Sequence, residues 1–77
     1  MNLKSSLSII LRKMRLKVFM SQREFSRTRG IDRSTYNAWE TGRRIPLPES
    51  IKVVVDWYTT KGIDTSALVI EYEKAKA

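Results

Sequence analysis

Residues 30–44, GIDRSTYNAWETGRR, combine arginine with short polar side chains, a set of groups that suits the binding of anions. Arg33 lies near the start of this segment, and Arg43 and Arg44 end it. The planar guanidinium group donates paired hydrogen bonds that match phosphate oxygens and the edges of bases. The hydroxyl and amide groups between the arginines add further donors and acceptors. The segment therefore indicates a surface that recognises a charged partner.

Catalytic and metal-binding chemistry has little support in the composition. The chain contains no cysteine and no histidine, which excludes disulfides and thiolate metal sites and removes the usual general base. The carboxylates of Glu24, Asp32 and Glu40 each have a simpler role within a helix. We therefore expect a binding protein that is not an enzyme and that holds no metal or cofactor.

The net charge of +7, from 15 basic and 8 acidic residues, is concentrated in the central part of the chain. All of the excess lies between positions 12 and 44, where the charged residues are Arg12, Lys13, Arg15, Lys17, Arg23, Arg27, Arg29, Arg33, Arg43 and Arg44 against Glu24, Asp32 and Glu40. Such a concentration favours a polyanionic partner. Charge alone does not separate DNA from RNA, from an anionic lipid surface, or from a merely solvated basic face.

The length of 77 residues fits one small domain, which we place at residues 1–77. Hydrophobic residues make up 42% of the chain, as expected for a globular protein rather than a disordered tail. No apolar run approaches the ~18 residues that a membrane span needs. Residues 1–15 resemble a signal peptide only weakly, because their apolar stretch is short and interrupted. We expect a cytoplasmic protein with no membrane partner.

The first part of the chain predicts two helices. Apolar residues recur at helical spacing from Leu3 to Lys17, which predicts an amphipathic helix over that range. Ser21 followed by Glu24 three residues later forms a capping-box pattern. A second helix should therefore run from Gln22 to about Thr28 and end at Gly30.

Three further helices follow in the pattern. Asp32 should cap a helix from Arg33 to about Thr41, with Ile31, Tyr36 and Trp39 in the core. A fourth helix should begin at Pro48, bury a stripe at Ile51, Val54, Val55 and Tyr58, and end at Gly62. A fifth should follow a cap at Asp64 or Thr65 and fray near Lys74. The fold class is therefore all-α, with five helices.

Residues 20–46, MSQREFSRTRGIDRSTYNAWETGRRIP, resemble the helix-turn-helix of the Cro/repressor-like family, also called the Xre or lambda-repressor-like family. The positions that agree with the family pattern are Met20, Ser21, Gln22, Phe25, Ser26, Gly30, Ile31, Tyr36, Trp39, Glu40, Gly42, Arg43 and Pro46. The resemblance implies a five-helix lambda-repressor-like domain whose second and third helices form the motif. In this motif the start of the third helix enters the major groove of DNA.

The resemblance also assigns roles to individual residues. The residues that would contact bases are Arg33, Ser34, Asn37 and Ala38. The residues that would contact phosphates are Gln22, Arg23, Thr35, Arg43 and Arg44. Arg15 and Glu40 match a structural ion pair that joins the first helix to the end of the third. Arg33 is equally suited to a guanine edge and to a phosphate, and Asp32 is expected to cap the helix without touching DNA.

Three residues depart from the family pattern. Arg29 stands where a buried leucine is usual, which predicts a looser or more exposed end of the second helix. Phe19 stands where a turn glycine is frequent, which predicts a different first turn. Ser26 replaces the usual alanine where two helices cross, and serine is small enough to fit.

Taken with the charge, the resemblance implies a sequence-specific regulator of transcription that binds double-stranded DNA, of phage or mobile-element type, in a bacterial cell. No small-molecule ligand is expected. The resemblance also implies binding as a homodimer, through the fifth helix and the preceding loop, with Ile63, Val69 and Tyr72 as the apolar contacts; the alternative is a monomer in which these residues cover the core. The alternative is an antitoxin or anti-repressor that uses the same fold to bind another protein.

Overall fold

The computed structural model describes residues 6–76, which form five α-helices and no strand. The helices are α1 (Ser6–Lys17), α2 (Gln22–Arg29), α3 (Arg33–Glu40), α4 (Pro48–Thr60) and α5 (Ser66–Lys76). The expected all-α, five-helix class is thereby confirmed. The predicted start of the first helix at Leu3 lies outside the described residues.

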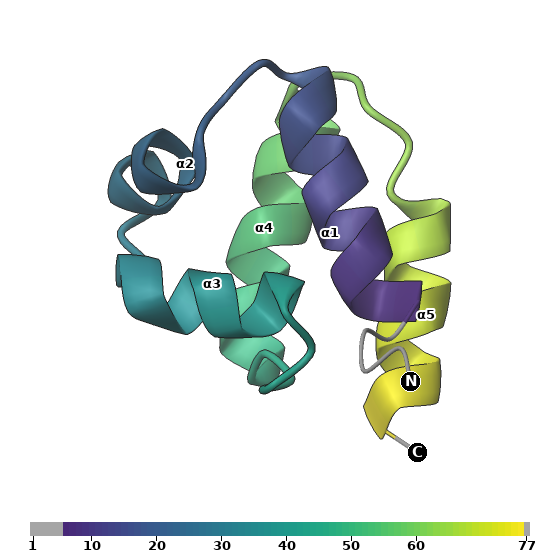
Figure 1. The fold of residues 1–77 in the computed structure, drawn as a ribbon. Coiled ribbons are helices and arrows are strands. Elements are labelled where there is room, and N and C mark those ends of the chain that lie inside the picture. The colour runs from purple at the N-terminus through teal and green to yellow at the C-terminus, as the bar shows by residue number, and fades with distance from the viewer. Residues whose placement is uncertain (1–5, 77) are drawn as a thin grey trace.

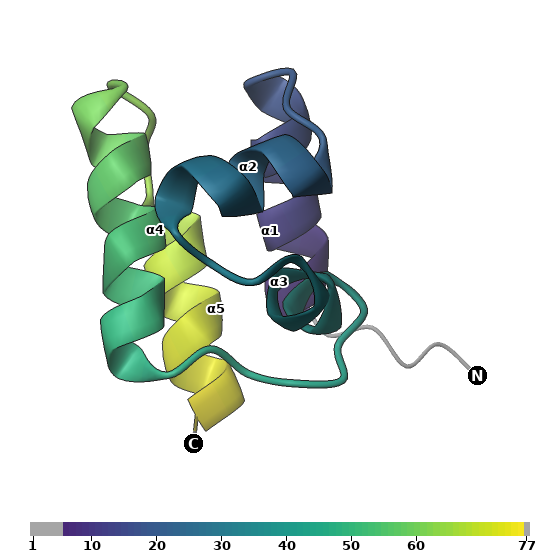
Figure 2. The ribbon, with the colours of Figure 1, turned by 90° about the vertical axis from the view of Figure 1, so that its left-hand side faces the viewer.

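Helix α1 is the central element of the fold, because it packs against α3 on one side and α5 on the other (Figure 1). The short helices α2 and α3 pack against each other at an angle, as the perpendicular view shows (Figure 2). The buried apolar residues come from all five helices and are Leu7, Leu11, Met14, Phe25, Tyr36, Ala38, Trp39, Ile51, Val54, Tyr58, Leu68 and Tyr72. Of the stripe predicted for α4, Val55 is only partly buried.

The helix boundaries agree with the caps read from the sequence. Ser21 accepts a hydrogen bond from the backbone N–H of Glu24 at 3.0 Å, and the Asp32 carboxylate accepts one from that of Thr35 at 3.3 Å. Gly30 ends α2 with a φ of +71°, in the left-handed region that glycine adopts readily. The α2–α3 connection is therefore fixed by backbone conformation at both ends. Helices α2 and α5 extend one or two residues further than expected, and α3 ends one residue earlier.

A cluster of aromatic rings joins α2, α3 and α4. The ring of Phe25 lies 5.1 Å from that of Tyr36 and 5.6 Å from that of Tyr58, measured between ring centroids. Trp39 packs edge-on against Tyr36 at 5.7 Å. Aromatic pairs at these separations contribute about 0.5–1.5 kcal/mol beyond the area that they bury. The expectation that Tyr36 and Trp39 are core residues is confirmed.

The sequence predicted a looser or more exposed end of α2 at Arg29, and this residue is only partly buried, but the helix is not loose there. Its guanidinium carbon lies 4.0 Å from the centroid of the Trp57 ring on α4, and α2 continues through this residue. Partial burial lowers the pKa of the Arg29 guanidinium, which stays cationic. Arg29 therefore replaces a buried apolar side chain by stacking its planar group on an indole.

Arg15 and Glu40 form a buried ion pair between α1 and the end of α3. Arg15 Nε and Nη2 donate to the two carboxylate oxygens of Glu40 at 2.7 and 3.0 Å, and the two side chains are 8% and 2% exposed. Gln22 Nε2, at the start of α2, donates to Glu40 Oε1 at 3.0 Å. Arg15 Nη1 donates to the carbonyl oxygen of Met20 at 2.7 Å. Three helices and the α1–α2 turn therefore converge on one pair of charges.

Burial opposes ionisation of the Glu40 carboxyl, but the hydrogen bonds from Arg15 and Gln22 and the nearby charge outweigh it and lower its pKa. The stabilisation that this shift supplies is therefore complete above the unfolded-state pKa of about 4.5. It is lost as the pH falls through the lower folded-state pKa, because the unfolded chain then binds more protons.

Glu40→Leu should destabilise the domain by about 3–5 kcal/mol, because it leaves the buried Arg15 guanidinium without its counter-charge. Adding Arg15→Met to this variant should restore part of the loss, since the unpaired charge is then removed. Urea unfolding followed by circular dichroism measures both variants. As the pH falls below about 4.5, the wild type should also lose stability more steeply than the double variant, which lacks the Glu40 carboxyl. A double variant no more stable than Glu40→Leu would contradict this account.

The α1–α2 turn contains a bulky residue in the left-handed region. Phe19 has a φ of +60°, a conformation that a residue with a Cβ atom adopts only at a cost. Its side chain is 93% exposed and packs against nothing in the core. The sequence predicted a different first turn, because Phe19 stands where glycine is frequent. The backbone instead keeps the left-handed conformation that suits glycine, and the aromatic side chain is exposed to solvent.

Phe19→Gly and Gly30→Ala should change stability in opposite directions. Phe19→Gly should stabilise the domain by about 0.5–1 kcal/mol, because relief of the left-handed backbone exceeds the extra entropy of the unfolded chain. Gly30→Ala should destabilise it by about 1 kcal/mol from backbone strain alone, since no atom lies within 4 Å of the added Cβ. Urea midpoints compare the two with wild type. Equal effects of the same sign would show that φ does not govern stability at these turns.

Candidate nucleic-acid interface

The exposed side of α3 carries the polar residues singled out in the sequence. Burial of Tyr36 and Trp39 turns the opposite side of this short helix outward. On that outward side Arg33 and Ser34 are exposed, and Thr35 and Asn37 are partly buried. The α2–α3 connection holds the start of α3 in place through Gly30 and the Asp32 cap. The helix-turn-helix thus presents the first two turns of α3 on a fixed frame.

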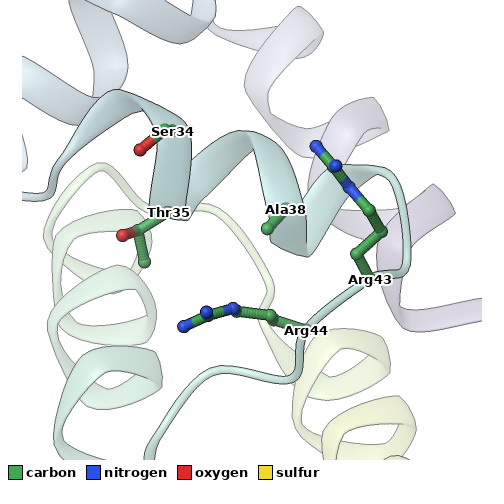
Figure 3. A pocket seen from close by; sticks show the side chains of 5 residues that line it. All are labelled: Ser34, Thr35, Ala38, Arg43 and Arg44. Atoms are coloured by element: carbon green, nitrogen blue, oxygen red, sulfur yellow. The ribbon is translucent and has the colours of Figure 1, made fainter.

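One hollow lies between α3 and the loop that follows it. It is lined by Ser34, Thr35, Ala38, Arg43 and Arg44 (Figure 3). Arg44 extends along α3 toward Thr35, whereas Arg43 extends beside the C-terminal end of the helix. Two guanidinium groups and two hydroxyls around one depression are donors of the kind that a phosphate group accepts.

The loop arginines are held close to α3 through the backbone. The amide N–H groups of Arg43 and Arg44 both donate to the carbonyl oxygen of Ala38, at 2.9 and 3.2 Å. Arg43 Nε also donates to the hydroxyl of Thr41 at 3.3 Å. The two cations therefore start from defined positions beside the helix.

A second hollow lies between the start of α2 and the outer side of α3. It is lined by Gln22, Arg33, Ser34 and Asn37. Ser34 borders both hollows, so the two form one continuous polar surface along α3. The side-chain amide of Gln22 is held there by Glu40, which links this surface to the buried ion pair. The fold brings to these two hollows eight of the nine contact residues that were predicted from the sequence.

Arg23 is the predicted contact residue that lines neither hollow; it is exposed on α2. Ala38 lies in the first hollow but is only 8% exposed. It therefore offers little surface to a ligand.

Asp32 does more than the sequence indicated. Its carboxylate accepts a hydrogen bond from the hydroxyl of Ser34 as well as from the backbone of Thr35. These hydrogen bonds lower the pKa of the exposed Asp32 carboxyl. The hydroxyl proton of Ser34 is therefore directed to the Asp32 carboxylate, and its oxygen lone pairs remain for a ligand. The spacing of an N-cap aspartate and a serine two residues later was the available sequence signal.

Neither a metal site nor a membrane-spanning helix is present in the described part of the chain. Residues 6–76 contain no group of three or more acidic, histidine or cysteine side chains placed to hold a metal ion. Within the same residues, no helix has both the length and the apolar character that crossing a bilayer requires.

Comparison with protein families agrees with this geometry, whereas no curated protein and no solved structure gives a significant match to the chain. A family model described as a helix-turn-helix domain matches residues 9–74, which include most of α1, all of α2, α3 and α4, and most of α5. The chain therefore belongs to this Xre/Cro-like family of helix-turn-helix domains, which bind DNA rather than catalyse reactions and have the lambda-repressor-like fold.

Proposed function

We propose that this protein is a sequence-specific transcriptional regulator of Cro/repressor type, from a phage or mobile element, that occupies a DNA operator in a bacterial cell. The observation that carries the proposal is the continuous polar surface on α3, bordered by Arg33 at one end and by Arg43 and Arg44 at the other. A major groove about 12 Å wide admits one α-helix. Helix α3 is the element that the motif places there.

The base-reading residues in this proposal are Arg33, Ser34, Asn37 and Ala38. Arg33 is exposed and long enough to donate two hydrogen bonds to guanine O6 and N7, and Asn37 has the amide that pairs with adenine. Ser34, whose proton goes to Asp32, would accept a hydrogen bond from a base amino group. The methyl group of Ala38 would meet at most one thymine methyl group.

The phosphate-binding residues in this proposal are Gln22, Arg23, Thr35, Arg43 and Arg44. Two arginines and a threonine hydroxyl in the first hollow favour a phosphate on one strand. The free backbone N–H groups at the start of α2, next to Gln22, favour a phosphate on the other side of the groove. Arg23 is exposed beside them on α2 and adds positive charge.

A homodimer through α5 fits the surface, with a change in the residues involved. Tyr72, expected in the contact, is buried and donates its hydroxyl hydrogen bond to the carbonyl oxygen of Pro46 at 2.9 Å. Ile63 is partly buried. Val69 and Ile70, at 41% and 54% exposure, are the large apolar residues of α5 that remain available to a second copy. Two copies would match a palindromic operator with half-sites about one helical turn apart.

The alternative role, as an antitoxin or anti-repressor, would use exposed apolar residues outside α3. Val53 on α4 and Ile45 and Leu47 in the α3–α4 loop are exposed and could contact a protein partner. DNA binding is favoured because the charge excess lies in the segment that contains α3.

Selection of bound sequences from a random pool of duplexes should give one preferred operator, whose symmetry reports the number of copies bound. Affinity for that operator should fall at least 100-fold between 50 and 200 mM salt, because several phosphate contacts release counterions. Fluorescence anisotropy with the labelled duplex measures the loss. The absence of binding to any duplex at low salt would contradict the proposed function.

Arg33→Ala and Arg43→Ala should weaken binding in different ways. Arg33→Ala should relax preference at a single base pair by about 1–3 kcal/mol, because it removes a base-edge contact. Arg43→Ala should weaken binding evenly across sequences and reduce the salt slope by about 1, because it removes a phosphate contact. Competition between single-base operator variants distinguishes the two. Equal weakening of all sequences by Arg33→Ala would assign Arg33 to a phosphate.

A further inference from the structure

Phe19 is costly to the isolated domain in two ways. Its backbone is held in the left-handed region at φ +60°, and the residue is 93% exposed to solvent. Glycine or asparagine would adopt this turn at lower cost. No contact of the side chain within the described part of the chain compensates for this cost, so the ring does not stabilise the folded domain. Backbone strain of this kind is concentrated at functional sites in proteins.

The turn that carries Phe19 is rigidly held. The backbone N–H of Phe19 donates to the carbonyl oxygen of Leu16 at 3.1 Å, and that of Met20 donates to the carbonyl oxygen of Arg15 at 3.4 Å. On the other side of the turn, Arg15 Nη1 donates to the carbonyl oxygen of Met20 at 2.7 Å. The backbone position of Phe19 is thus fixed before any partner arrives, which lowers the entropy cost of a contact.

Phe19 lies close in the chain to Gln22, which borders the polar surface of α3. It precedes Gln22, which lines the second hollow, by three residues, so their Cα atoms are at most about 11 Å apart. Figure 2 shows the α1–α2 connection descending from the top of α1 to the start of α2, with α3 below it. The turn that carries Phe19 therefore adjoins the end of α2 that would point at a phosphate in the proposed complex.

The surroundings of Phe19 favour an anionic partner. Lys13 and Lys17 are exposed on the last two turns of α1, and Arg23 is exposed on the first turn of α2. Between positions 12 and 27 the acidic residue is Glu24, against six basic residues. A partner that fits both an aromatic ring and this charge must carry phosphate groups and apolar surface. Duplex DNA has both, in its phosphates and in the sugar walls of its minor groove.

We infer that Phe19 contacts the duplex just outside the half-site read by α3, with its ring against the sugar wall of the adjoining minor groove and Lys17 near a flanking phosphate. The phosphates at the start of α2 border the major groove that holds α3, and the minor groove begins on the far side of that strand. Apolar side chains are used in this groove by other DNA-binding proteins. The inference rests on the proposed function and extends the contact beyond the operator core.

The test compares Phe19→Gly with wild type on two duplexes that contain the selected operator. One duplex ends at the edge of the half-sites, and the other extends about ten base pairs further on each side. Phe19→Gly should bind the extended duplex about 5- to 10-fold more weakly than wild type, as expected for partial loss of a buried phenyl ring. On the trimmed duplex the two proteins should bind equally. Phe19→Tyr should retain the preference for the extended duplex.

Val53→Ala on α4 is the matched control, an exposed apolar residue truncated away from the turn, and should bind both duplexes like wild type. Urea unfolding of Phe19→Gly shows whether the variant is folded, so weak binding cannot be ascribed to instability. Equal affinity of Phe19→Gly and wild type for the extended duplex would overturn the inference. The exposed ring would then be assigned to contact with a protein partner. An equal loss on both duplexes would also overturn it. Failure of wild type to bind any duplex would instead overturn the proposed function, and the inference with it.

Discussion

The ion pair between Arg15 and Glu40 is the interaction on which the arrangement of this domain depends. A buried pair is not in itself strongly stabilising, because removing both charges from water costs about as much as their attraction returns. Its effect is geometric: Glu40 ends α3, Arg15 belongs to α1, and the remaining hydrogen bonds reach Gln22 and the α1–α2 turn. Any movement of α3 relative to α1 would leave a charge unpaired in the interior.

The aromatic cluster complements this pair from the other side of α3. Phe25, Tyr36 and Tyr58 fill the space between α2, α3 and α4 with large rings that meet in tilted and stacked arrangements. The ion pair adds hydrogen bonds between fixed atoms of α1 and α3. A domain this small has a modest core, so the combination of one directional contact and a few large side chains is an economical way to hold α3.

Much of the fold could be read from the sequence because its signals are local. Ser21, Gly30 and Asp32 set helix ends through backbone conformation and short-range hydrogen bonds, and each was found from residue type and spacing. The roles of Arg29 and Tyr72 were not found, because they depend on Trp57 and Pro46, which are distant in sequence. The candidate site followed the same rule. Its residues were predictable from the motif, whereas the limited exposure of Ala38 depends on how α3 packs in the folded domain.

The attachment of the loop arginines has a consequence for how such a domain can diversify. The amides of Arg43 and Arg44 bind the carbonyl oxygen of residue 38, which every amino acid possesses, and not its side chain. Substitutions at the outward positions of α3 can therefore accumulate without moving the two cations. In evolution, the residues of α3 that determine specificity can change one at a time while Arg43 and Arg44 keep their positions. Each intermediate sequence therefore retains the electrostatic attraction that these two cations supply.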